Sequence, residues 1–224
     1  MTIKDIKFLN SEAYMLKDLS LSLHECEEQM RKIDYDGFYD AYRHCKDENG
    51  VEKTQFPSII YSFYSIVFNS NRIPEPRELL EAYYVLNSKE LSVKEGIVIY
   101  KNRSFKKADL DARILRTYPS LIRDYHFYLM LVETACFDKV IYSCKNDVNG
   151  IDITIVHNDK KYVLSLFVKT SRSTHYKAIK NTYRHDYDDN EIQLPLDLMN
   201  AKKCGDFFVY DKQDLRKVQE AILN

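Results

Sequence analysis

The stretch from Gly150 to Ser173, GIDITIVHNDKKYVLSLFVKTSRS, carries two charged side chains beside apolar runs. Asp152 precedes the run ITIV, and Lys169 ends the run YVLSLFVK. Alternation of apolar residues predicts two strands, and the polar HNDKK between them predicts a hairpin. Because an apolar strand needs neither charge, Asp152 and Lys169 are the first candidates for chemistry.

The spacing of the two charges predicts that they share a face of the hairpin. A two-residue loop at Asp159-Lys160 places Asp152 opposite Phe167 and makes Lys169 its diagonal neighbour. Because side chains alternate between faces, a register shift of two residues changes the partner but not the face. The plainest interpretation is an ion pair between neighbouring strands.

Two flanking segments add further candidates. Glu133 lies in LMLVETACF, where an acid among apolar residues costs free energy unless it is paired or binds a metal. The segment RSTHYKAIKNTYRH predicts a helix with one basic side, and its start suits a phosphate. A solvated charged face would have the same pattern. The residues that would contact a nucleic-acid backbone are Ser171, Arg172, Ser173, Lys177, Lys180 and Arg184.

The elements that would position these residues divide the chain near residue 118. Residues 1–118 are predicted to be a mostly helical domain that binds DNA or a partner, with a first helix capped by Ser11 and a last helix stopped by Pro119. Residues 119–224 predict, in order, a helix, three strands, a helix, a strand and a closing helix. The fold class expected is therefore α/β.

Asp152, Lys169 and this order of elements resemble the PD-(D/E)xK, or restriction-endonuclease-like, phosphodiesterase superfamily. The core of this superfamily is α-β-β-β-α-β, with an Asp on the second strand and the (D/E)xK triplet on the third. The resemblance covers about residues 119–224. It implies that Asp152 holds Mg²⁺ or Mn²⁺, that Glu133 shares the ion directly or through water, and that Lys169 orients the attacking water and stabilises charge on phosphate.

The triplet departs from this pattern. It reads Phe167-Val168-Lys169, so a ring stands where the superfamily has a metal-binding carboxylate. Three interpretations remain: the acid has moved, the domain binds nucleic acid without cutting it, or the sheet belongs to another α/β fold. The substitutes for the missing acid would be Glu133, Asp147 and Asp186.

The resemblance therefore predicts a nucleic-acid-associated protein with metal-dependent DNA hydrolysis, in restriction, mobile-element or phage biology. The alternative is a catalytically inactive module of the same fold that binds DNA or a protein partner. A third class, suggested by 18 Tyr and no Trp, is an interaction protein that forms a homodimer through a tyrosine-rich surface.

Composition limits the kinds of partner and the cellular compartment that are expected. The formal net charge of −1 gives no overall basic field, so nucleic-acid binding needs a local basic face. One such cluster lies in SFKKADLDARILRTYPSLIRD, whose cations contact DNA or pair with nearby aspartates, including Asp124. Five Cys without a CxxC pair predict a reduced, cytoplasmic protein. The absence of a long apolar run predicts no membrane span, and the first residues show no apolar leader.

Overall fold

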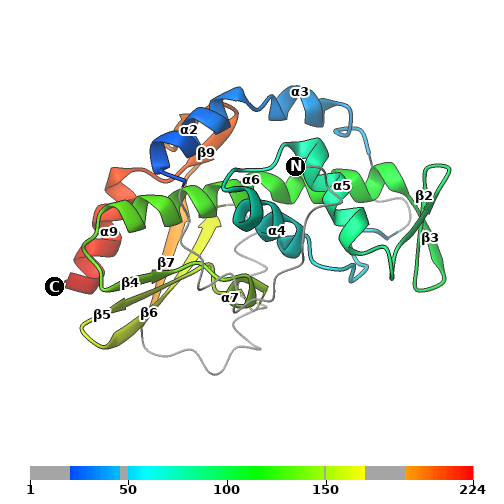
Figure 1. The fold of residues 1–224 in the computed structure, drawn as a ribbon. Helices are drawn as coiled ribbons and strands as arrows, with labels where there is room; N and C mark the ends of the chain where they lie inside the picture. Colours follow the sequence, from blue (N-terminus) through cyan, green and yellow to red (C-terminus); the bar gives the residue numbers. More distant parts are fainter. Residues whose placement is uncertain (1–20, 46–49, 149, 170–189, 224) are drawn as a thin grey trace.

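The computed structural model describes residues 21–45, 50–148, 150–169 and 190–223, which form a mixed α/β structure (Figure 1). Its helices are α2 (Leu23–Lys32), α3 (Tyr35–Asp40), α4 (Ile60–Ser70), α5 (Pro76–Leu86), α6 (Lys107–Glu133), α7 (Cys144–Val148) and α9 (Lys212–Leu223). Its strands are β1 (Ser92–Lys94), β2 (Ile97–Tyr100), β3 (Arg103–Lys106), β4 (Lys139–Ile141), β5 (Ile153–His157), β6 (Lys160–Val168), β7 (Glu191–Leu196), β8 (Lys202–Cys204) and β9 (Phe207–Val209).

The largest sheet has the order β4-β5-β6-β7. Strands β4, β5 and β6 pair antiparallel, and β7 pairs parallel to β6. The run IQLPLDL, expected to be irregular or an edge strand, is the edge strand β7. A parallel pair requires a crossover connection, and the segment between β6 and β7 that was predicted to be a basic helix lies outside the described residues.

The register of the β5–β6 hairpin corrects the predicted one. His157 pairs with Lys160, so the loop is Asn158-Asp159 rather than Asp159-Lys160. Both loop residues have positive φ, 50° and 59°, which Asn and Asp tolerate better than most residues. Continuing the register from the pair Ile153 and Leu164 puts Asp152 level with Ser165, not with Phe167. The shift of two residues leaves the predicted face unchanged.

Helix α6 runs for 27 residues straight through Pro119, so the prediction that a helix stops there was wrong. Proline has no N–H to bond the carbonyl of Leu115, four residues earlier. The hydroxyl of Tyr35 on α3 donates to that carbonyl at 2.9 Å instead. The domain boundary expected at residue 118 thus falls inside one helix, and the larger core takes side chains from both sides of it.

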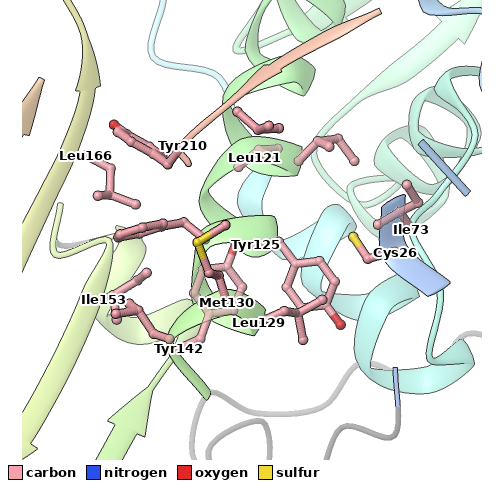
Figure 2. Packing of buried hydrophobic residues seen from close by; sticks show 14 of the residues in the cluster. Cys26, Ile73, Leu121, Tyr125, Leu129, Met130, Tyr142, Ile153, Leu166 and Tyr210 are labelled. Carbon is pink, nitrogen blue, oxygen red and sulfur yellow. The ribbon is translucent and has the colours of Figure 1, made fainter. Parts of the chain in front are cut away.

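The larger core lies where α6 crosses the sheet. Leu121, Tyr125 and Leu129 repeat every four residues on α6, so they form one face of the helix. Figure 2 shows this face between Ile153 and Leu166 of the sheet on one side and residues of the first half of the chain on the other. The residues next to these positions on α6 are therefore held at fixed places in the fold.

The first half of the chain is helical with one small sheet. The helix expected from Ser11 begins, within the described residues, only at Leu23, because Ser22 caps it through its hydroxyl and Glu25 bonds back to the Ser22 amide. Ser11 itself lies outside the described residues. The single strand expected near EGIVIYKNRSF is a three-stranded antiparallel sheet, β1-β2-β3. No helix in the described ranges is long and apolar enough to cross a bilayer.

Candidate functional site

Asp152 lies at the amino end of β5, just beyond its last pair with β6. Its Oδ2 atom accepts a hydrogen bond of 2.5 Å from the amide of Leu166. Within the ladder, a backbone carbonyl of the neighbouring strand would accept such a bond. The side chain is partly buried and is held at the end of the sheet.

Two further aspartates approach this position from other elements. Asp124 lies on α6, and Asp147 lies in the first turn of α7. Burial raises the pKa of Asp124 well above its usual range, the guanidinium of Arg123 opposes that shift, and the charges of Asp152 and Asp147 raise the pKa further. Because these effects require proximity, three carboxylates from three separate elements share one electrostatic environment.

The Asp124 side chain is only 15% exposed, and its Oδ1 atom has no hydrogen-bond partner among the described residues. The nearest cation is Nε of Arg123 at 3.6 Å, too long for a hydrogen bond, and that buried nitrogen also lacks a partner within the described ranges. Leaving such atoms unpaired costs free energy, and they often mark the place of a water or an ion. The Asp124 carboxyl is therefore suited to hold a proton or a cation.

Two buried tyrosines border the carboxylates. The hydroxyl of Tyr210 donates to the carbonyl of Leu194 at 2.9 Å. Burial is the main cause that raises the pKa of Tyr210, and the charges of Asp124 and Asp152 raise it further against the opposing charge of Arg123. For Tyr142, burial raises the pKa first, then the charges of Asp147 and Asp124. The rings are therefore neutral and apolar walls next to the acids.

The oxygen donors present suit a hard divalent cation such as Mg²⁺ or Mn²⁺. No group of three or more His, Cys, Asp or Glu side chains in the described residues is arranged to hold a metal ion. Magnesium sites commonly use one or two carboxylates, with waters and substrate phosphate completing the coordination. An ion at this place would therefore be held by one or two of these aspartates and completed by water and phosphate, not by a full protein cage.

Lys169 lies at the same end of the sheet as Asp152. Its side chain is exposed, and its amide donates to the carbonyl of Leu196 at 2.8 Å, which extends the pairing of β6 with β7. Because Asp152 is level with Ser165, Lys169 lies four residues further along the chain, just past the end of β6 and about 13 Å away at strand rise. The diagonal contact predicted from the earlier register therefore does not follow from the observed one.

Glu133 is placed elsewhere. It is the last residue of α6, it is exposed, and its Oε1 atom accepts a hydrogen bond of 2.6 Å from the amide of Leu23 at the start of α2. It lies nine residues after Asp124, about 13 Å along the helix. The structure brings Asp124 rather than Glu133 towards Asp152, and gives Glu133 the task of capping α2.

The remaining predicted residues divide into two groups. The expected backbone-binding set, Ser171, Arg172, Ser173, Lys177, Lys180 and Arg184, and the substitute acid Asp186 lie outside the described residues. The cations before Asp124 are largely engaged within the fold. Arg113 bonds the carbonyls of Val51 and Thr54, Arg116 pairs with Glu52, and Lys107 pairs with Asp111 at 2.7 Å.

A separate cleft of about 500 Å³ lies between α2, α6 and α9, lined in part by Leu23, Glu27, Met130 and Arg216. Burial opposes ionisation of Glu27, but hydrogen bonds from Lys202 and His126 outweigh it and lower the pKa of Glu27 to about 2. This carboxylate is thus a fixed anion that links α2 to its neighbours.

The chain was compared with protein-family models, with curated proteins and with solved structures, and none of them matches it. The case for a function therefore rests on the geometry of the carboxylates and the sheet that positions them.

Proposed function

We propose that this protein is a metal-dependent phosphodiesterase that acts on DNA, with Asp124 and Asp152 as the ligands of its metal. The observation that carries the proposal is the electrostatic interaction between a buried carboxyl on α6, whose Oδ1 atom has no hydrogen-bond partner among the described residues, and the carboxylate just before β5. Asp147, named from the sequence as one substitute for the missing acid of the triplet, adds negative charge that favours a cation at the same place.

The order of elements supports a restriction-endonuclease-like core. The helix α6 precedes three antiparallel strands, with the short helix α7 between the first two. Asp152 lies just before the second strand, and Lys169 follows the third. Strand β7 then adds to the third strand in parallel.

The chemistry that follows is hydrolysis of a phosphodiester. A bound divalent ion would supply an activated water and neutralise charge on the phosphate. Asp124 and Asp152 would hold that ion, and Lys169 would stabilise the negative charge on phosphate at the same end of the sheet. The water oxygen forms one bond to phosphorus while one phosphorus–oxygen bond to the sugar breaks. The products are a phosphate monoester and a hydroxyl.

The second candidate is a module of this fold that binds DNA or a protein partner without cutting. Two observations favour it. Phe167 supplies no oxygen ligand, and the Oδ2 atom of Asp152 already accepts a short bond from the Leu166 amide. A carboxylate oxygen used in this way is less available to an ion, which weakens coordination relative to a free acid.

Cleavage separates the two candidates. Supercoiled plasmid and single-stranded DNA are incubated with Mg²⁺ or Mn²⁺ and with wild type, Asp152→Asn, Asp124→Asn or the control Glu133→Gln. The proposal predicts metal-dependent cleavage by wild type and Glu133→Gln, and a loss on the order of a hundredfold in both aspartate variants. Absence of cleavage by wild type with either metal would refute the enzyme and leave the binding module.

A further inference from the structure

The small sheet β1-β2-β3 has a charge balance unlike that of the whole chain. Residues 92–106 contain four cations against one carboxylate, Glu95, which gives a net charge of +3 in a chain whose formal net charge is −1. The four cations are Lys94, Lys101, Arg103 and Lys106. A local field of this sign attracts polyanions even though the whole protein does not.

The inner face of this sheet is anchored in a core of its own. Val98, Tyr100 and Phe105 point inward and are 0%, 5% and 1% exposed. They belong to a second hydrophobic cluster that includes Leu80 of α5 and Leu110 of α6. The sheet is therefore fixed to α5 and α6 through one face, which leaves its other face to solvent.

The outer face follows from the register. Lys94, Ile97 and Lys106 lie opposite one another across the three strands. Two residues away along each strand, Ser92, Ile99 and Ser104 also lie opposite one another on the same face. All six are exposed, and the two isoleucines, at 38% and 43%, are among the more exposed large apolar residues described. The face thus carries an isoleucine between two lysines beside an isoleucine between two serines.

Two tight turns hold the strands of this sheet together. The turns Glu95-Gly96 and Lys101-Asn102 both have positive φ at each residue, which matches the twist of antiparallel strands. The second turn places Lys101 at the tip, where its ammonium lies 5.1 Å from the centre of the Tyr100 ring. Figure 1 shows β2 and β3 at the opposite end of the molecule from α9.

We propose that the outer face of β1-β2-β3 binds the sugar–phosphate backbone of a nucleic acid. The lysines neutralise phosphates, the serine hydroxyls donate to phosphate oxygens, and the isoleucines pack against the sugars. Sheets and β-ribbons are established readers of nucleic-acid grooves. The choice of a nucleic acid as the polyanion rests on the proposed function, whereas the binding itself requires no cleavage.

Helix α6 sets the distance between this face and the aspartates. It begins at Lys107, directly after β3, and reaches Asp124 seventeen residues later. At helix rise this is about 25 Å, which corresponds to roughly seven base pairs of duplex at 3.4 Å each. A duplex that touched both places would therefore have its phosphates contacted by the sheet about seven base pairs from the position of cleavage.

The test measures binding without metal. A labelled 30-base-pair duplex is titrated in EDTA at several salt concentrations with wild type, with Lys94→Ala/Lys106→Ala, and with the matched control Lys160→Ala/Lys161→Ala in the β5–β6 hairpin. The control removes two exposed cations from another hairpin. The slope of log K against log salt should fall by about two for the sheet variant and should be nearly unchanged for the control.

Three results would overturn this inference: no binding of duplex by wild type at low salt, equal losses in the two double variants, or competition by polyglutamate as effective as that by DNA. The outcome is separable from the phosphodiesterase proposal. Salt-sensitive binding through the sheet without cleavage would refute only the enzyme, and cleavage with unaltered binding by Lys94→Ala/Lys106→Ala would refute only the sheet surface.

Discussion

At Asp124, burial and neighbouring negative charge both oppose ionisation. A carboxyl whose pKa is higher in the folded chain binds its proton more tightly there than in the unfolded chain. The free energy of unfolding therefore falls as the pH rises from the unfolded value, near 3.9, towards the raised value. Each pH unit in that window costs about 1.4 kcal/mol.

Asp124→Asn should remove this penalty, because the amide keeps the shape of the carboxyl and cannot ionise. We expect the variant to be more stable than wild type at pH 8 and nearly equal to it at pH 4, measured by denaturant unfolding in EDTA. The opposite result, a variant that loses stability at pH 8, would show that Asp124 is ionised and stabilised by Arg123.

Of the two aspartates of the candidate site, only Asp152 could be identified from the sequence. Asp152 was found from the sequence because a charge beside a strand stands out, whereas Asp124 was read only as a partner for nearby cations. The signal at Asp124 was the same as at Glu133, an acid within the apolar part of one helix. Only the packing of α6 on the sheet decides which acid faces Asp152 and which reaches α2.

At the scale of elements, α6 depends on a bond that no local pattern reveals. Pro119 leaves the carbonyl of Leu115 without its helical partner, and the hydroxyl of Tyr35, eighty residues away in the sequence, supplies the donor. Sequence reasoning applied the usual rule for proline and ended the helix. The rule failed because a long-range side chain satisfied the backbone.

Tyr35→Phe should therefore destabilise the protein by about 1–2 kcal/mol, since the buried carbonyl loses its donor. In a Pro119→Ala background the alanine N–H can bond Leu115, so the same substitution should cost less. A double-mutant cycle should give a coupling of about 1 kcal/mol. Tyr42→Phe, which removes a hydroxyl from the turn after α3, is the control, and equal costs in both backgrounds would exclude this role for Tyr35.

The strands and the closing helix were easier to predict than the register in which the strands pair. β5, β6 and α9 follow from alternation and from helical spacing, and these predictions were confirmed. The hairpin loop was displaced by one residue along the chain, because Asn158 and Asp159 both adopt positive φ. The face of the hairpin predicted for Asp152 is unchanged, because a register shift of two residues preserves the alternation of side chains.

For the whole molecule, the change in composition and predicted secondary structure near residue 118 suggested two domains, but α6 belongs to both halves. Its first turns carry the cluster around Phe105 and Leu110, and its later turns carry the core around Tyr125 and Leu129. A composition change at residue 118 could not reveal this, because a helix may bury different faces against different partners along its length. The same rigid element links the basic sheet to the aspartates.

The claim on which the account rests is that Asp124 and Asp152 hold one divalent cation together. Calorimetric titration of wild type with Mn²⁺ at pH 7, in two buffers of different ionisation enthalpy, measures both binding and proton release. We predict one bound ion, net release of protons because the raised pKa of Asp124 makes the ion compete with a proton there, and affinity at least about tenfold lower in Asp124→Asn and Asp152→Asn, with Glu133→Gln unchanged. No binding by wild type, or equal binding by Asp124→Asn, would contradict the account.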